Sequence, residues 1–295
     1  MPPELSPALY RAGHGEPLVL VHGFTATWRC WLPVLAELVP RFEVIAPTLH
    51  GHDGGPQPPD GPARSLSEAA DHMERWLDEQ GIGTAHFAGN SMGGALSLEA
   101  AKRGRARSVV AISPGGGWRE GDRDEVERVI RLFKRNRAAA RAARRYAQKM
   151  FSRPRLRRLG FRDFMTRGHL MPGIEALRMA ESSLRCDVVD DVYATMRDGS
   201  ARVVDLDRVS CPVLVAWGEF DRVLPLDRHA ARFREETPGV EFRVLRGLGH
   251  VPMWDDPALL AHTIGDFAAA AAAAQDGATP RFHKAAPRPP AVIPS

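Results

Sequence analysis

Short apolar runs that each end at a turn recur along this chain and alternate with helical patterns. A short continuous apolar run is typical of a strand that is buried on both faces of a parallel sheet. Residues 66–80 begin at a capping serine, Ser65 or Ser67, and end at Gly81, which is the pattern of a helix between two such strands. This alternation predicts an α/β fold with a doubly wound, mostly parallel sheet. The strands are expected at 9–11, 18–21, 42–46, 85–88, 109–112, 213–217 and 240–245.

The alternation stops after Trp118 and resumes near Val203. The residues between them contain no strand-like run, carry an Arg-rich helical pattern over 124–150, and are interrupted at Pro154 and Pro172. We interpret this stretch as a helical insertion. The predicted organisation is a core formed by 1–118 and 203–272, an insertion formed by 119–202, and a disordered tail over 273–295, a stretch rich in proline and alanine with few large apolar residues.

Composition excludes several classes of protein. With 295 residues, 44 % of them hydrophobic, the chain can bury a sizeable core. The net charge of +4 comes mainly from arginine in a chain rich in alanine, glycine and proline, which indicates codon usage rather than a nucleic-acid partner. The sequence shows no secretory signal and no apolar run of the roughly 18 residues that span a bilayer, so we expect a cytoplasmic protein without an integral membrane segment. The three cysteines, Cys30, Cys186 and Cys211, form no disulfide or zinc-binding pattern.

The hexapeptide GNSMGG at 89–94 lies between a predicted strand and a predicted helix. It satisfies the pattern GxSxG, and its context is that of a nucleophile elbow, in which a serine occupies a sharp turn at the end of a strand. Gly89 and Gly93 leave room where a Cβ atom would clash, and the helix that begins at Met92 directs its N-terminal amides toward the reacting group. Ser91 is therefore the predicted nucleophile. The alternative is a serine that only caps the helix.

A serine nucleophile needs a general base, and the base needs an acid that orients it. Asp221 follows the strand expected at 213–217, and His250 follows the strand expected at 240–245. Both lie at the carboxyl ends of strands, as Ser91 does, so we predict that Ser91, Asp221 and His250 are the catalytic residues. Of the other candidates, Glu219 falls two residues early, Asp255 and Asp256 are expected to cap the helix near Pro257, and His229 and His262 are expected to be ordinary helix residues.

Four separated motifs together resemble the α/β-hydrolase family, in the form that carries a helical lid or cap. The resemblance covers residues 9–267 and implies an α/β-hydrolase fold with an inserted helical cap. The motifs are LVHGF at 20–24, GNSMGG at 89–94, GEFDRVLP at 218–225 and GHVPMWDDP at 249–257.

The resemblance also assigns roles around Ser91. The backbone N–H groups of Phe24 and Met92 would form the oxyanion hole. No cofactor is implied. No metal is implied either, because the stretch HGHD at 50–53 does not complete the metal-binding pattern HxHxDH. A small-molecule substrate is expected, and either a monomer or a homodimer. The candidate pocket residues are His22, Trp28, Asn90, Met165 and Val251, although His22 is expected mainly to hold its loop in place.

The expected function is that of a cofactor-free serine hydrolase acting on a largely apolar carbonyl substrate, with a carboxylic ester as the first choice. GNSMGG is also similar to the elbow of hydrolases that cleave carbon–carbon bonds in ring-fission products, which is the first alternative. Epoxide hydrolase and haloalkane dehalogenase are disfavoured because both use an aspartate where Ser91 stands. Two other classes are a receptor-like module that binds a ligand without turnover and a membrane-surface protein that uses basic helices. The arginines of those helices, among them Arg128, Arg131, Arg135 and Arg145, are interpreted mainly as a solvated helix face.

Overall fold

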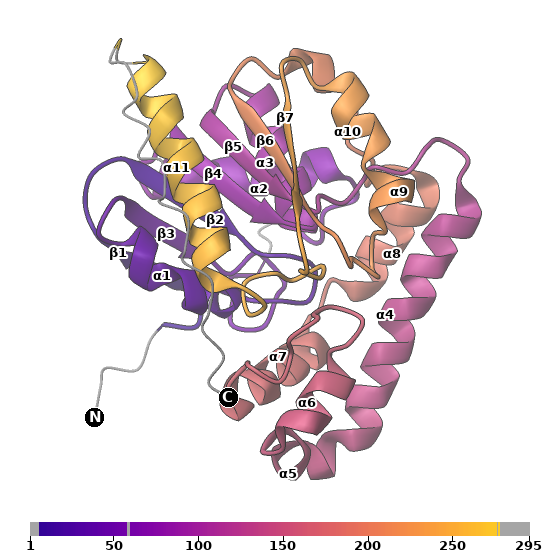
Figure 1. Cartoon of the computed structure of the whole chain (residues 1–295). Helices are drawn as coiled ribbons and strands as arrows, with labels where there is room; N and C mark the ends of the chain where they lie inside the picture. Colours follow the sequence, from indigo (N-terminus) through magenta and orange to yellow (C-terminus); the bar gives the residue numbers. More distant parts are fainter. Residues whose placement is uncertain (1–5, 58–59, 276, 278–295) are drawn as a thin grey trace, which may run out of the picture.

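One seven-stranded sheet forms the centre of the molecule in the computed structural model, which describes residues 6–57, 60–275 and 277 (Figure 1). The strand order is β1-β3-β2-β4-β5-β6-β7, and every neighbouring pair is parallel except β1 with β3. The prediction of a doubly wound, mostly parallel sheet is confirmed. The strands are β1 (Leu9–Ala12), β2 (Pro17–Val21), β3 (Glu43–Pro47), β4 (Ala85–Asn90), β5 (Ala106–Ile112), β6 (Val213–Gly218) and β7 (Glu241–Leu245).

The strands lie where the apolar runs predicted them, and burial explains why. Every residue of β4 and β6 is buried, as is all of β2 after Pro17, so these strands need apolar side chains on both faces. Ser91 directly follows β4, Asp221 lies in the loop after β6, and His250 lies in the loop after β7. Because these strands are parallel, the three loops leave the sheet at the same edge.

Helices cover both faces of the sheet. On one face α1 (Leu32–Leu38) packs beside α11 (Pro257–Gln275), and on the other α2 (Leu66–Glu79) packs beside α3 (Met92–Lys102), as Figure 1 shows. Ser65 is the N-cap of α2, where its hydroxyl accepts a hydrogen bond of 3.0 Å from the Glu68 N–H. The shorter core elements are η1 (Trp28–Trp31), η3 (Leu206–Arg208), α9 (Leu226–His229) and α10 (Ala231–Glu236).

Helix α11 is the one described helix that is long and apolar enough to cross a membrane. Leu260, Ile264 and Ala268 on this helix are buried in the core against the sheet, so core packing accounts for its apolar composition. The predicted start of the tail at residue 273 is wrong, because α11 continues to Gln275, whose Nε2 donates to the carbonyl oxygen of Arg107 at 2.9 Å. Beyond that residue, the predicted tail lies outside the described residues apart from residue 277.

Between β5 and β6 the chain forms the helices α4 to α8, called the inserted helices below. They lie beyond the edge of the sheet where the parallel strands end (Figure 1). The Arg-rich pattern predicted over 124–150 does not form a single helix, because the 3-10 turn η2 interrupts it. None of residues 134–146 is buried, so no packing against the core holds this stretch in a single straight helix. The elements are α4 (Arg123–Ala143), η2 (Arg144–Tyr146), α5 (Ala147–Phe151), α6 (Pro154–Gly160), α7 (Gly173–Arg185) and α8 (Val189–Asp198).

The contact between α3 and β2 predicts a large difference between two glycine substitutions. A Cβ atom at Gly93 would lie 2.1 Å from the carbonyl oxygen of Val21, whereas one at Gly83 would meet nothing within 4 Å. We expect Gly93→Ala to lower the free energy of unfolding by about 3 kcal/mol, because backbone must move to admit the methyl group. Gly83→Ala should change it by less than about 0.5 kcal/mol. Urea unfolding of both variants checks this, and equal midpoints would contradict it.

Candidate active site

Ser91 lies in the turn between β4 and α3. Its backbone has a φ of 56° and a ψ of −117°, a conformation that residues other than glycine rarely adopt. A Cβ atom at Gly89 would lie 2.1 Å from the carbonyl oxygen of Gly93, and one at Gly93 would lie 2.1 Å from that of Val21, so both positions require glycine. The Ser91 side chain makes no capping hydrogen bond to α3. The helix-cap alternative therefore lacks its defining contact.

Asp221 and His250 face each other from neighbouring loops. The Nδ1 atom of His250 lies 2.7 Å from Oδ2 of Asp221, and both side chains are almost completely buried. The other carboxylate oxygen, Oδ1, accepts hydrogen bonds from the backbone N–H groups of Val223 at 2.9 Å and Leu224 at 2.7 Å. These contacts fix the carboxylate so that one oxygen accepts the Nδ1 proton. The Nε2 atom of His250 is then the nitrogen that can accept another proton.

Asn90 connects the turn of Ser91 to the loop that carries His250. Its side-chain amide donates to the carbonyl oxygen of His250 at 2.8 Å and to that of Ile112 at 3.2 Å. Asn90 also borders the cavity described below, as predicted, but both of these bonds go to backbone of the protein. We infer that Asn90 positions the backbone of His250 relative to Ser91. The sequence indicated this residue only as part of the elbow motif.

His22 holds the loop after β2 that carries Phe24. The Leu49 N–H donates to Nε2 of His22 at 2.9 Å, so the ring proton lies on Nδ1, which donates to the Gly23 carbonyl oxygen at 2.8 Å. Burial and, next, the nearby His52 ring hold the pKa of His22 well below its usual range. His22 is therefore neutral, and both of its ring nitrogens are used in hydrogen bonds that hold the loop.

The backbone N–H groups of Phe24 and Met92 belong to segments that meet at Ser91. A Cβ atom at Gly23 would lie 3.2 Å from both the Asn90 carbonyl oxygen and the Ser91 Cβ atom, which shows how closely the two segments approach. Met92 is the first residue of α3, so no carbonyl within that helix can accept its N–H. The use of these two amides as an oxyanion hole stays a prediction.

Thr25, directly after Phe24, also has a positive φ, of 63°. This is unusual for a β-branched residue, and such strain persists only where the surroundings enforce it. The carbonyl oxygen of Thr25 accepts a hydrogen bond from Ser182 Oγ on α7 at 3.3 Å. The strained loop is thus in direct contact with the inserted helices. Nothing in the sequence marked Thr25.

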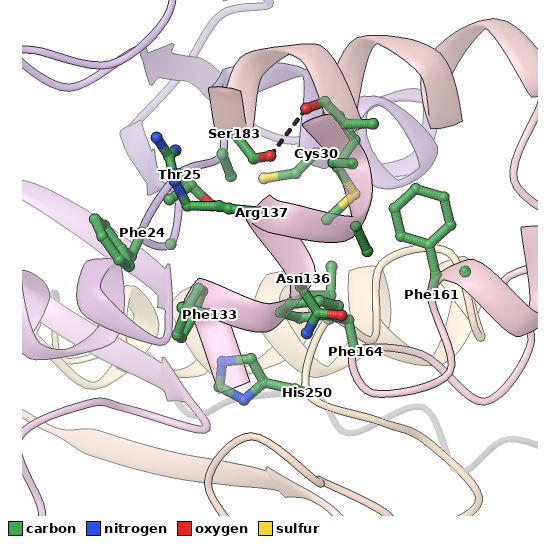
Figure 2. Close-up of a pocket in the computed structure, with 18 of the residues that line it drawn as sticks. Phe24, Thr25, Cys30, Phe133, Asn136, Arg137, Phe161, Phe164, Ser183 and His250 are labelled. Carbon is green, nitrogen blue, oxygen red and sulfur yellow. Dashed lines mark hydrogen bonds between the residues drawn. The ribbon is translucent and has the colours of Figure 1, made fainter. Parts of the chain in front are cut away.

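Ser91 and His250 both border one cavity, called the first cavity below (Figure 2). Its volume is about 1070 Å³, including the part that opens to solvent. The core supplies the loop around Phe24, and the inserted helices supply most of the remaining wall. Its polar side chains besides Ser91 and His250 are few, and Figure 2 shows Arg137, Asn136 and Ser183 among them. Its large apolar side chains are Phe24, Phe133, Met150, Phe151, Phe161, Phe164, Met179 and Val251.

A second cavity, of about 730 Å³, also reaches Ser91 and shares Phe24 and Phe133 with the first. Among the described residues, its wall contains no charged side chain. Apart from Ser91, its polar groups are the hydroxyl groups of Ser65 and Thr195 and the buried indole N–H of Trp118, which has no hydrogen-bond partner in the described part of the chain. The second cavity is therefore suited mainly to an apolar group. Ser91 borders both cavities.

Val251 borders the first cavity as predicted, but Trp28, Met165 and His22 border neither cavity. Trp28 is completely buried, and its indole N–H donates to the Ser6 carbonyl oxygen at 2.9 Å. Met165 is 2 % exposed and points into the core, while the preceding residue, Phe164, borders the first cavity. The expectation that Trp28 and Met165 line the pocket was wrong, because the sequence places residues near the site but does not say which way their side chains point. His22 holds its loop, which was its main expected role.

Asp255 and Asp256 have different roles, although the sequence predicted a helix cap for both. Asp256 does cap α11, accepting the Leu259 N–H at 3.0 Å. Asp255 is buried and accepts backbone N–H groups of Gly249 at 2.9 Å, Thr166 at 3.0 Å and Arg167 at 2.6 Å. It therefore ties the loop before His250 to the inserted helices.

Cys30 borders the first cavity, but it is a poor candidate for a second nucleophile. Burial raises the pKa of its thiol, so the reactive thiolate is not populated. Within the described parts of the chain, no group of three or more His, Cys, Asp and Glu side chains could hold a metal ion. In the HGHD stretch, the His52 ring packs against His22 at a centroid distance of 4.9 Å, and Asp53 pairs with Arg185 at 3.5 Å.

Glu125, near the start of α4, connects the inserted helices to the loop of Asp221. Its Oε1 atom lies 2.8 Å from Nε2 of His229 and also accepts from Arg128, whose Nη2 donates to the Val223 carbonyl oxygen at 2.6 Å. Burial alone would raise the pKa of Glu125, but the hydrogen bonds from Arg128 and His229 lower it to about 2. Arg128 is therefore not part of a purely solvated face, and His229 is not an ordinary helix residue.

The sequence matches the alpha/beta hydrolase family over residues 18–263, and the chain belongs to that family. Among its relatives, epoxide hydrolase EphH of Mycobacterium tuberculosis is 33 % identical over 206 residues, which cover 69 % of this chain and 94 % of the relative. A thermophilic esterase from Thermogutta terrifontis has a similar structure, with a TM-score of 0.66, 24 % identity, and coverage of 90 % of this chain and 93 % of the esterase.

A 2-hydroxy-6-oxo-6-phenylhexa-2,4-dienoate hydrolase from Rhodococcus sp. strain RHA1 is also similar, with a TM-score of 0.69 and 20 % identity, covering 88 % of this chain and 93 % of that chain. At these identities the structural likenesses establish the fold alone. The family and the fold together identify a hydrolase.

The hydrogen bonds of Asn90 predict a pH-dependent defect in the variant Asn90→Asp. An ionised carboxylate would face the carbonyl oxygens of His250 and Ile112 without a proton to donate, so we expect the free energy of unfolding at pH 7 to fall by about 3 kcal/mol. The new carboxyl should have a raised pKa, so the defect should shrink as the pH falls and the group becomes protonated. Urea unfolding at several pH values checks this, and wild-type stability at pH 7 would contradict it.

The lowered pKa of Glu125 predicts a stability contribution that acid removes. A carboxyl with a folded-state pKa of about 2 and a usual value of 4.5 stabilises the fold fully above pH 4.5, and this contribution is lost as the pH falls toward 2. Glu125→Gln should therefore be less stable than wild type at pH 7, with a difference that narrows below pH 4.5. The matched control is Glu127→Gln on the same helix, where an exposed pair with Arg197 should contribute little. A constant difference across this pH range, measured by urea unfolding, would contradict the assignment.

Proposed function

We propose that this protein is a serine hydrolase that uses Ser91, His250 and Asp221 on a carboxylic ester. The observation that carries the proposal is the pairing of His250 with Asp221 at 2.7 Å in the wall of a largely apolar cavity that also contains Ser91 in its strained turn. A base oriented by a buried carboxylate can activate a nearby hydroxyl. An apolar cavity excludes water from the reacting groups and strengthens the electrostatic interactions within it.

In the proposed mechanism, Ser91 Oγ attacks the carbonyl carbon while His250 Nε2 takes its proton. The backbone N–H groups of Phe24 and Met92 stabilise the oxyanion of the tetrahedral intermediate. His250 then protonates the leaving oxygen, and the ester bond breaks to give an acyl-serine. Water, activated by His250, releases the acid and restores Ser91. Asp221 holds the imidazole in the required tautomer throughout.

Carbon–carbon bond hydrolysis is the second candidate. It is supported by the GNSMGG elbow and by the likeness of the fold to a hydrolase of 2-hydroxy-6-oxo-6-phenylhexa-2,4-dienoate. The same serine, histidine and oxyanion-binding groups could serve either reaction. Turnover of such a ring-fission product at a rate above that of esters would favour this candidate.

Epoxide hydrolysis is the activity named for the Mycobacterium tuberculosis relative, and it fits Ser91 less well. A carboxylate that opens an epoxide forms an ester, which water can then hydrolyse. A serine that did so would form an ether, which water does not readily cleave. An aromatic epoxide such as styrene oxide therefore belongs in the test, and sustained turnover of it would count against the proposal.

The first experiment compares wild type with Ser91→Ala on p-nitrophenyl esters of short and medium chain length, with fluorophosphonate labelling of both proteins. We expect Ser91→Ala to lose about 1000-fold or more in kcat/KM and to remain unlabelled. The control is Ser183→Ala, a second serine of the first cavity whose hydroxyl donates to the Ala180 carbonyl oxygen at 2.8 Å, and it should still be labelled. Equal ester turnover by wild type and Ser91→Ala would overturn the proposal. Labelling of wild type without multiple turnover would instead favour the receptor-like alternative.

A further inference from the structure

Arg137, on α4, places an unpaired cationic side chain beside the first cavity. Its Nη1 atom is buried and has no hydrogen-bond partner, and within the described parts of the chain Arg137 forms no ion pair. Figure 2 shows the side chain among the residues that line the cavity, with its guanidinium toward the loop of Phe24 and Thr25. A buried guanidinium donor without a partner is uncommon in native proteins and calls for an explanation.

The wall of the first cavity offers Arg137 no negatively charged side chain. Among the described residues, no Asp or Glu borders this cavity. Cys186 and Tyr193 interact with the Arg137 charge, but burial raises the pKa of Cys186 to about 11 and also raises that of Tyr193, so both side chains are neutral near pH 7. Two other arginines of α4 do have partners, since Arg128 pairs with Glu125 and Arg135 with Asp163. Arg137 is thus available to an anion that enters the cavity.

The two cavities at Ser91 differ in the charge of their walls. Arg137 and His250 border the first cavity, whereas among the described residues neither these two nor any charged side chain borders the second. The imidazole that protonates the leaving group must lie next to the leaving oxygen. The leaving group should therefore occupy the first cavity, with Arg137, and the apolar part of the acyl group should occupy the second.

We propose, on the basis of the serine-hydrolase function above, that the substrate is an ester whose alcohol part carries a carboxylate that binds Arg137. In the reaction, the acyl carbon forms a bond to Ser91 Oγ, its bond to the leaving oxygen breaks, and His250 transfers its proton to that oxygen. The released product is a hydroxy acid with its carboxylate still ionised. Water then converts the acyl-serine into an apolar carboxylic acid. Arg137 acts here as a specificity-determining residue.

The test uses butyryl esters of 4-hydroxybenzoate and 4-hydroxyphenylacetate, each compared with the corresponding neutral methyl ester. The measured quantity is the ratio of kcat/KM for the anionic ester to kcat/KM for the neutral ester. We expect this ratio to be about 10-fold or more lower in Arg137→Gln than in wild type, because a guanidinium–carboxylate pair is lost. Arg137→Lys should restore part of this ratio. Arg141→Gln is the matched control, because Arg141 lies one turn further along α4, is exposed and does not border the first cavity. Its ratio should equal that of wild type.

A binding measurement separates failure of this inference from failure of the proposed function. Binding of 4-hydroxyphenylacetate to Ser91→Ala is measured by calorimetry, and the combination of Ser91→Ala with Arg137→Gln should weaken it by about 10-fold or more. If no ester is turned over, the proposed function fails, and this measurement still decides the role of Arg137. The inference is overturned if Arg137→Gln leaves both the ratio and the binding unchanged. It is also overturned if wild type has a higher kcat/KM for a p-nitrophenyl ester that carries the carboxylate on its acyl part, such as p-nitrophenyl monoglutarate, than for the butyryl esters that carry it on the alcohol part.

Discussion

The close approach of α3 to β2 is the constraint on which the site depends. The backbone of Gly93 lies so near the carbonyl oxygens of Val21 and His22 that no side chain fits there. This contact brings the turn of Ser91 against the loop that carries Phe24. The turn of Ser91 and the loop of Phe24 are thus placed relative to each other by backbone packing of helix α3 against strand β2. Side-chain flexibility has little influence on that arrangement.

A second set of interactions connects this rigid centre to the remaining groups. Asn90 bonds to the backbone of His250, and Asp255 joins the same loop to Thr166 in the inserted segment. The guanidinium of Arg128, on α4, donates hydrogen bonds to the carbonyl oxygens of Arg222 and Val223 in the loop of Asp221. The inserted helices therefore do more than cover the cavity. Through these hydrogen bonds the inserted segment helps to fix the positions of the loops that carry Asp221 and His250.

Much of the fold followed from local pattern. Strands buried on both faces must be apolar throughout, and their turns are marked by glycine and proline, so each strand could be located from the sequence. The Arg-rich helix was located, but not its break at residues 144–146, because the break reflects missing packing rather than a local signal. The pocket residues were predicted less well. Trp28 and Phe164 are both aromatic residues near the site, and only the packing around them decides that one is core and the other borders the cavity.

The sequence by itself determined the order of the strands, the presence of a helical insertion between two of them, the glycine-flanked turn of Ser91, and the positions of Asp221 and His250 at the carboxyl ends of strands. These features are local, since each depends on a strand, the turn after it and the residues within that turn. Only the tertiary structure decided that Asp221 and His250 lie in contact, and that the Nη1 atom of Arg137 is buried without a hydrogen-bond partner among the described residues. Contacts between residues far apart in the chain depend on how helices and loops pack together. Helical periodicity predicts which residues share a face of a helix, but it does not predict which other residues that face contacts.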